Sequence, residues 1–333
     1  MNLISVNKQA YNNIDCIKVC MAVLVVATHT SFFSFIKSPE IYKAVFTSLS
    51  VKVPFFYAAS GFLVWNKVYD ASNEDKLCRL KGWICKTLRL YLIWTLIYMP
   101  FTIYGFYLDG LSPLKSIGVF FRNFLLVGQN FYSWQLWYLL GTLVAAIIVY
   151  LLIKVKCKLI LMYCLAAVFA IIGILLDYCA SNNYLHDLTS LYFKLFTTTR
   201  NGFFQGFPYI MIGISVANDG IIKSKGKLCL ILLLAFIAHM LEFKLATFIM
   251  TYALFSLVIQ FDLRPRQDQL YKHFRLASTV VYLVHMIWVG VFTFIIPIRN
   301  NILLFIVAIV MSFASAYLAI KFKESKVVRQ LFR

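Results

Sequence analysis

Long runs of hydrophobic residues, separated by short polar connections, follow one another along almost the whole chain. A run of about 20 mostly apolar residues is long enough to cross a lipid bilayer as a helix. Helices are the expected form, because lipid offers the backbone no hydrogen-bond partners and an α-helix satisfies its own. We predict ten spans, near residues 17–36, 45–66, 84–106, 135–153, 158–176, 202–217, 227–241, 244–260, 277–296 and 301–321.

These spans predict an all-α fold, a polytopic bundle of membrane helices. Neither a Gly/Ser-rich nor a Pro-rich linker interrupts them, so we treat residues 1–333 as one domain. The connections near 67–83 and 177–201 are predicted to be polar and too short to fold alone. The apolar segment 115–127 carries Arg122, and we interpret it as an interfacial helix, with a re-entrant piece as the alternative.

The amino-acid composition supports membrane spans over a soluble core. Of the 333 residues, 62% are hydrophobic and 14% are charged. A soluble domain has roughly 25% charged residues and about 45–50% apolar ones. The excess of apolar residues cannot fit inside one globular core.

Basic residues are concentrated in alternate connections. One set of connections, together with Lys8 and the C-terminal tail, holds 21 Lys and Arg, and the other set holds 8. The richer set is expected to face the cytoplasm, which places both termini there. Membrane orientation thus accounts for the net charge of +19 without a nucleic-acid partner.

The eight cysteines predict neither a disulfide framework nor a metal site. Most of them lie at or near the predicted cytoplasmic side, where thiols stay reduced. Cys16 and Cys20 are four residues apart, but no second pair completes a zinc site.

The first predicted span carries three ionisable residues on or near one helix face, Asp15, Lys18 and His29. His29 lies eleven residues after Lys18, which is about 16 Å along a helix and three turns plus roughly 20°. Ionisable residues inside a membrane are functional candidates by default. The alternatives are a buried histidine hydrogen-bonded between helices, a first-turn acid at Asp15, and a snorkelling Lys18.

The third predicted span adds Lys86 and Arg89, three residues apart on one face. With Lys18 they could form a basic mouth on the cytoplasmic side, suited to phosphate groups. The alternative is that these charges only orient the helix.

Four further residues are candidates for substrate binding. Ser60 precedes Gly61 in an apolar run, where helix packing is the favoured role. Trp137 and Tyr138 suit either an aromatic belt at the outer face or a platform for stacking sugars. His285 lies roughly 12 Å into the ninth span and is a second imidazole that could pair with His29.

In order and spacing, these motifs resemble those of the acyltransferase family 3 membrane proteins, over residues 12–290. The first span of that family typically reads Asp-x-x-Arg, then ten residues, then His. Here Asp15, Lys18 and His29 occupy those positions, and Lys86-x-x-Arg89 corresponds to the family's Arg-x-x-Arg. At both positions lysine replaces arginine, which keeps the positive charge but loses the guanidinium fork that binds two oxygens of a phosphate at once.

Other stretches resemble further motifs of the family. PFFYAASGFL (54–63) is similar to Pro-x-Phe-Phe-x-x-Ser-Gly-Phe/Tyr, and QLWYL (135–139) to His-Leu-Trp-Tyr/Phe-Leu, with Gln135 replacing His. RNGFFQGFPYIMIG (200–213) and VYLVH (281–285) resemble the family's sixth and ninth spans.

The resemblance implies an O-acyltransferase of a bacterial plasma (inner) membrane. Its donor would be cytoplasmic acyl-coenzyme A, usually acetyl-CoA, bound at Lys18, Lys86 and Arg89. Its acceptor would be a hydroxyl of a surface glycan or of a lipid-linked precursor. His29 could act as a general base or carry the acyl group itself. Asp15 lies too far from His29 to orient it, and we expect it to order Lys18 or a neighbouring basic group.

A transporter is the alternative function. The membrane part of the vancomycin-resistance serine racemases is similar to this family and is thought to import serine. Paired broken helices near the midplane would favour transport, and Pro208 is the one strong interruption before Pro297. The sequence leaves the acceptor, the acyl chain and the oligomeric state open.

Overall fold

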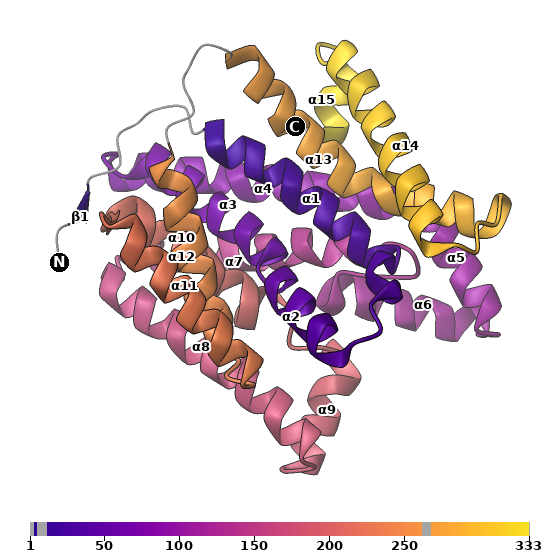
Figure 1. The fold of residues 1–333 in the computed structure, drawn as a ribbon, viewed down its shortest axis with the longest axis horizontal. Helices are drawn as coiled ribbons and strands as arrows, with labels where there is room; N and C mark the ends of the chain where they lie inside the picture. The colour runs from indigo at the N-terminus through magenta and orange to yellow at the C-terminus, as the bar shows by residue number, and fades with distance from the viewer. Residues whose placement is uncertain (1–2, 5–11, 262–267, 333) are drawn as a thin grey trace. The chain divides into compact units, whose positions relative to one another are not determined.

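The computed structural model describes residues 3–4, 12–261 and 268–332, and these form helices joined by short connections (Figure 1). The chain divides into two compact units, and each is described by itself. The first unit comprises Met1–Asn66 and Ile212–Arg333, and the second comprises Lys67–Met211.

The first unit contains the elements given in the next sentence, of which α3 and α10 belong to it only in part. Its elements are β1 (Leu3–Ile4), α1 (Asn12–His29), the 3-10 turn η1 (Phe32–Phe35), α2 (Pro39–Leu49), α3 (Lys52–Val68), α10 (Phe207–Asn218), β2 (Ile221–Ile222), α11 (Lys225–Met240), α12 (Ala246–Gln260), α13 (Asp268–Gly290), the π-helical turn η6 (Val291–Ile295), α14 (Asn301–Lys321) and α15 (Lys326–Phe332). The two short strands pair antiparallel, with Leu3 opposite Ile222.

Helix α13 is the centre of the packing in the first unit. It packs on both α1 and α14, and α11 packs on α12 (Figure 1). Helix α1 buries an apolar stripe that includes Ile14, Met21 and Val25, spaced seven and four residues apart. Helix α14 turns a stripe of small residues inward, including Ala308, Ser312 and Ala316, which permits close helix packing.

A glycine allows α10 to lie directly on α3. A Cβ atom at Gly213 would stand 1.9 Å from the carbonyl oxygen of Ala58. The two backbones are therefore in contact, and any side chain at this position would force the helices apart.

The second unit is built around α7. Its elements are α4 (Asn73–Ile97), α5 (Met99–Leu108), α6 (Pro113–Arg122), the π-helical turn η2 (Asn123–Val127), the 3-10 turn η3 (Trp134–Leu136), α7 (Trp137–Lys154), α8 (Leu159–Ser181), α9 (His186–Phe196) and the π-helical turn η4 (Gly202–Gly206). Helix α7 packs on α4 and on η4. A Cβ at Gly206 would lie 2.6 Å from the carbonyl oxygen of Gly141, so glycine is needed for this close approach.

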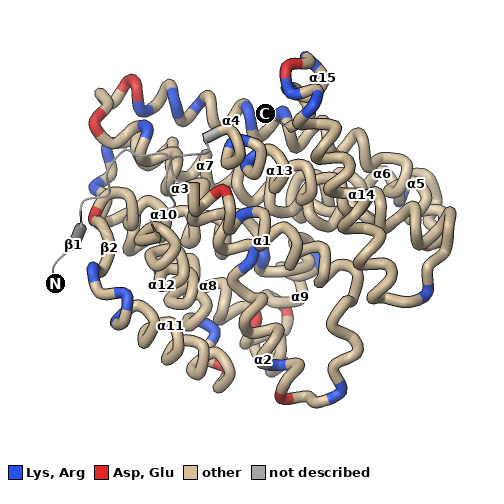
Figure 2. The backbone as a smooth tube through the Cα atoms, turned by 45° about the horizontal axis from the view of Figure 1, so that its top comes forward, with Lys and Arg blue, Asp and Glu red and all other residues tan. Residues whose placement is uncertain are grey.

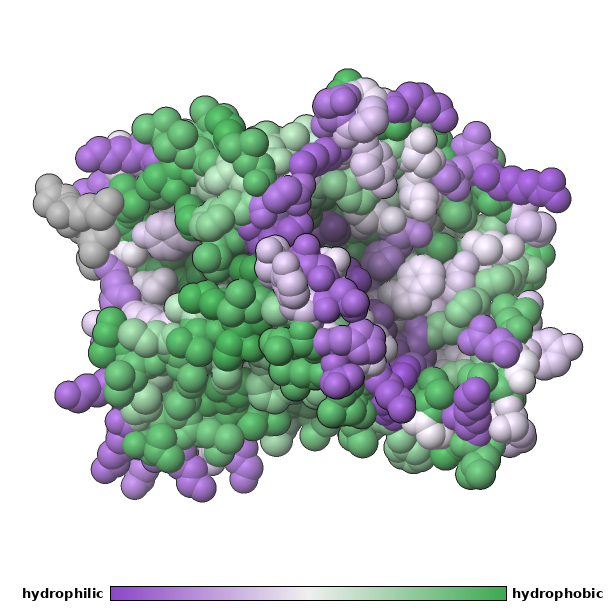
Figure 3. Space-filling model, turned by 90° about the horizontal axis from the view of Figure 1, so that it is seen from below, coloured by the Kyte–Doolittle hydropathy of each residue, from purple (hydrophilic) through white to green (hydrophobic). Residues whose placement is uncertain are grey.

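The protein is a helical membrane protein. Among the described residues, six helical segments are long and apolar enough to cross a bilayer. Helices α4 and α5 would make a seventh span, bent by 51° at Tyr98, where Pro100 cannot continue the backbone hydrogen bonding. Only 22% of the apolar window of α8 and 28% of that of α14 is buried, so their outer faces require lipid. Figure 3 shows hydrophobic residues over broad areas of one face.

The six segments coincide with six of the ten predicted spans, and the bent pair coincides with the third span. The six are Asn12–His29, Pro39–Val68, Trp134–Lys154, Leu159–Ser181, Gln269–Ile295 and Asn301–Lys321. The other three predicted spans fall on η4 with α10, on α11 and on α12, and each of these helices has fewer than 18 residues. The ten-span count and the cytoplasmic termini remain predictions.

Contacts between connections agree with the predicted sides of the membrane. Each of the following contacts joins two segments that the charge pattern assigns to the same side. They are Asn301 Nδ2 to Ser34 Oγ (2.9 Å), Lys43 Nζ to Glu242 Oε1 (2.5 Å), Arg122 Nη1 to the Lys194 carbonyl oxygen (3.2 Å) and Gln260 Nε2 to the Ile222 carbonyl oxygen (2.8 Å). Figure 2 shows most Lys and Arg at helix ends and in connections. Lys8, Arg264, Arg266 and Arg333, which enter the charge count, lie outside the described residues.

Two connections are more helical than predicted. Helix α4 begins at Asn73, within the predicted 67–83 connection, because Ser72 caps it by accepting from the Asp75 N–H. The 177–201 connection contains α9. The predicted interfacial helix at 115–127 corresponds to α6 and η2.

Candidate active site

The packing of α1 on α13 brings His29 and His285 together. Their ring centroids are 5.3 Å apart and the ring planes are inclined by 37°. His285 is fully buried, and His29 is half-buried. The expectation that these two imidazoles pair is confirmed as a contact.

A hydrogen bond to the backbone defines the tautomer of His285. Its Nδ1 lies 3.1 Å from the carbonyl oxygen of Val281. Because a carbonyl oxygen only accepts, Nδ1 carries the proton, and a neutral ring then keeps its lone pair on Nε2. Among the described residues, this buried Nε2 has no hydrogen-bond partner. His285 therefore presents an unused acceptor beside the His29 ring.

Aromatic side chains surround the histidine pair on the α13 side. The ring of Tyr282 lies 6.2 Å from that of His285, and the ring of Phe56 on α3 lies 5.4 Å from Tyr282. Phe56 and Tyr282 are both buried. The two imidazoles thus lie in an apolar part of the first unit.

A bidentate ion pair joins the other ends of the same two helices. Arg275 Nε lies 3.1 and 3.0 Å from the two carboxylate oxygens of Asp15, and Nη2 lies 2.7 Å from Oδ2. The Asp15 side chain is 2% exposed, whereas that of Arg275 is 59% exposed. A buried carboxylate needs such a partner, since an unpaired charge there would be strongly destabilising.

Arg275 is the residue that sequence reasoning missed. It entered only the count of orienting charges, while Asp15 was expected to order Lys18 or a neighbouring basic group. A signal was present, because α13 carries a basic residue ten positions before its histidine and α1 carries Lys18 eleven positions before His29. Two helices that pack in parallel carry their contacting residues in the same order along the chain, here a basic residue before a histidine.

The two contacts show that α1 and α13 run parallel. Asp15 meets Arg275 at their beginnings, and His29 meets His285 near their ends. Asp15 and His29 are fourteen residues apart, about 21 Å along the helix, so the carboxylate does not touch the ring. In the predicted topology both helices enter from the cytoplasm, with the ion pair inside and the histidines deeper.

The predicted donor-binding residues are divided between the two units. Lys18 is half-buried on α1, one turn after Asp15. Lys86 and Arg89 are exposed on α4 in the second unit. Their joint action remains a prediction.

The predicted substrate-binding residues other than His285 are in different surroundings. The Ser60 hydroxyl donates to the carbonyl oxygen of Phe56 (2.8 Å), one turn back in α3. Trp137 and Tyr138 are half-buried in the first turn of α7, in the second unit. Gln135, just before them, is 1% exposed.

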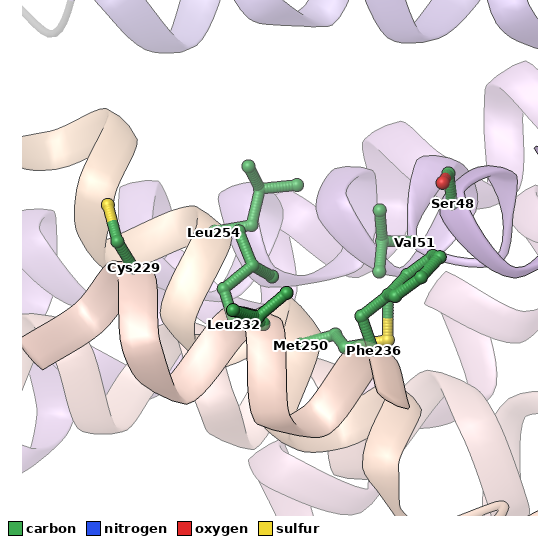
Figure 4. A pocket seen from close by; sticks show the side chains of 8 residues that line it. Ser48, Val51, Cys229, Leu232, Phe236, Met250 and Leu254 are labelled. Atoms are coloured by element: carbon green, nitrogen blue, oxygen red, sulfur yellow. The ribbon is translucent and has the colours of Figure 1, made fainter. Parts of the chain in front are cut away.

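A separate apolar cavity lies between α2, the turn that follows it, α11 and α12 in the first unit (Figure 4). Its volume is about 380 Å³. It is lined by Ser48, Val51, Cys229, Leu232, Leu233, Phe236, Met250 and Leu254. This lining contains neither an acid nor an imidazole.

The described residues contain no group of three His, Cys, Asp or Glu side chains that could hold a metal ion. All eight cysteines are free thiols.

Comparison with known proteins identifies relatives over most of the chain. The sequence model of acyltransferase family 3, described as an acyltransferase domain, matches residues 11–321. An amino-acid racemase of Enterococcus faecalis is 30% identical over 220 residues, which is 63% of this chain and 29% of that protein. A serine/alanine racemase of Enterococcus gallinarum is 24% identical over 330 residues, which is 94% of this chain and 46% of that protein. The chain therefore spans less than half the length of these two relatives. No solved structure matches.

Proposed function

Because the chain belongs to acyltransferase family 3, we propose that it is a membrane acyltransferase that transfers an acyl group, usually acetyl, from cytoplasmic acyl-CoA. The proposed acceptor is a hydroxyl of a surface glycan or of its lipid-linked precursor, and the proposed location is a bacterial plasma (inner) membrane. This proposal rests on one observation, the contact between His29 and His285 where the parallel helices α1 and α13 pack together.

In the proposed reaction, His29 is the general base. A ring nitrogen of His29 takes the proton of the acceptor hydroxyl while the hydroxyl oxygen attacks the thioester carbonyl. The new C–O bond forms, the C–S bond breaks, and the coenzyme leaves as a thiolate that takes the proton back. In the alternative sequence, the acyl group first forms an acyl-imidazole on His29 and is then passed to the hydroxyl.

His285 supports the first sequence by holding His29. Its Nδ1–H is anchored on the Val281 carbonyl, so its Nε2 is fixed as an acceptor. At a centroid separation of 5.3 Å, a small rotation brings a His29 N–H to that acceptor. In this proposal, the other nitrogen of His29 acts as the base. His285 is thus a positioning residue in this proposal.

The donor and acceptor reach the histidines from opposite ends. Lys18, Lys86 and Arg89 are proposed to bind the phosphates of the coenzyme, because ammonium and guanidinium groups form charge-assisted bonds to them. The long pantetheine arm then extends between the helices toward His29. Trp137 and Tyr138 are proposed to stack against the sugar of the acceptor, and Ser60 is proposed as a further substrate-binding residue.

The test is a chemical analysis of surface polysaccharide for ester-linked acetyl groups, with and without the gene. The proposal expects these esters to disappear with the gene and to return with the wild-type chain but not with His29→Ala. Unchanged ester content in the strain without the gene would contradict it.

The second candidate is a transporter of a small, serine-like amino acid, and the amino acid is chosen because the chain matches a serine/alanine racemase. Uptake of labelled serine into proteoliposomes would support transport. Its absence, together with acetyl transfer by the same protein, would favour the acyltransferase.

A further inference from the structure

The guanidinium group of Arg275 uses only part of its hydrogen-bonding capacity on Asp15. Nε and Nη2 contact the carboxylate, and within the described part of the chain no partner is recorded for Nη1. A guanidinium has five N–H donors, so three remain. The side chain is 59% exposed although the carboxylate beneath it is 2% exposed. The Asp15 carboxylate therefore holds one edge of the guanidinium, and the rest of the group is exposed.

Two more cations lie beside this ion pair. Lys18 follows Asp15 by one turn on α1, and Lys272 precedes Arg275 by one turn on α13, where it is exposed. Asp15 pairs with Arg275, and Lys18 and Lys272 place two further basic side chains near it on the two helices. Basic side chains favour the binding of an anion such as a phosphate.

We propose that Arg275, oriented by Asp15, binds a phosphate group of the acyl-CoA donor. The inference rests on the proposed function and adds a binding residue to it. The planar fork of an arginine matches phosphate oxygens in a bidentate way, which a lysine cannot do. Lys18, one turn after Asp15 on α1, lacks this fork.

The geometry of the helix pair suits this assignment. Arg275 and His285 are ten residues apart on α13, about 15 Å along the axis. In this proposal, the pantetheine arm of a donor whose phosphates bind at Arg275 extends along the helices toward the histidines.

The test measures binding of free coenzyme A to the purified full-length protein in detergent, by isothermal titration calorimetry. Arg275→Gln alone would leave the Asp15 carboxylate buried without a partner, so the informative variant is Asp15→Asn/Arg275→Gln. Its Kd for coenzyme A is expected to rise about 10- to 100-fold, the effect of one lost bond to a charged group. Arg275→Lys keeps the charge and is expected to recover only part of the affinity.

The matched control is Glu324→Gln/Arg329→Gln, which removes an arginine–carboxylate contact at α15. Its Kd is expected to stay within about twofold of the wild-type value. A monodisperse elution profile checks that each variant is folded. A wild-type Kd in the folded double variant, or no coenzyme binding by the wild type, would overturn the inference.

Acetyl transfer by the same preparations separates this inference from the proposed function. Binding that depends on Arg275, without acetyl transfer to any glycan, would contradict the function and leave the binding residue in place. Acetyl transfer by the wild type, with an unchanged Kd in the double variant, would support the function and contradict the binding role of Arg275.

Discussion

The substitution His285→Asn removes the hydrogen-bond acceptor Nε2 and keeps a donor in the place of Nδ1. In a histidine-to-asparagine change, the side-chain amide occupies the place of Nδ1 and can still donate to the Val281 carbonyl. Nothing then occupies the place of Nε2, so His29 loses the acceptor that we propose for it. His285→Gln is the matched variant, because its longer amide can present an oxygen near the Nε2 position.

The size of the effect follows from one hydrogen bond to a group that becomes charged during the reaction. Such a bond is worth about 1.5–3 kcal/mol, which lowers kcat about 10- to 100-fold. We expect His285→Asn to show this loss with little change in KM for acetyl-CoA. His285→Gln is expected to recover a substantial part of kcat, and His29→Ala to lower it about a thousandfold or more.

The assay is initial-rate transfer of labelled acetyl from acetyl-CoA to glycan, with membranes containing equal amounts of each variant. If His285 acts only through His29, adding His285→Asn to His29→Ala should produce no further loss. A wild-type kcat for His285→Asn, or a double variant whose losses multiply, would refute the positioning role.

Three further predictions follow from the helix ends and helix contacts. Lys18→Ala and Arg89→Ala should each raise KM for acetyl-CoA about tenfold with little change in kcat, and unchanged KM values would argue against phosphate binding there. Gly213→Ala should lower the melting temperature in detergent, because its Cβ would overlap a backbone carbonyl of α3, whereas Gly226→Ala, whose Cβ would meet its nearest atom at 3.9 Å, should be well tolerated. Two lysines beside Glu242, chiefly through hydrogen bonds, lower the pKa of its carboxyl to about 2. Because this folded-state pKa lies below the unfolded value of about 4.3, the stabilisation is present above that value and is lost as the pH falls toward 2. The difference in melting temperature between wild type and Glu242→Gln should shrink over this range, and a constant difference would contradict it.

The sequence pattern predicted the membrane character and the placement of most helices. Runs such as 158–176 and 301–321 are apolar on every face, and the structure places α8 and α14 there with largely outward-facing surfaces. Breaks within spans were not predicted. The bend at Tyr98 depends on Pro100, and the separation of α2 from α3 depends on local turn geometry at 50–51.

Of the candidate site, the contact between His29 and His285 was predictable because helical rise places both at similar depth. The pairing of Asp15 with Arg275 was not. These residues are 260 positions apart, and only the packing of α1 on α13 brings them together. Periodicity predicts which face of a helix is polar, but it does not identify the partner of that face.

The most direct measurement of the central claim uses labelled acetyl-CoA and inverted membrane vesicles containing either the wild-type chain or His29→Ala at matched levels. The account predicts ester-linked label in glycan with the wild type and background label with His29→Ala. Equal labelling by the two preparations would show that the His29 imidazole is not the group that carries out the transfer.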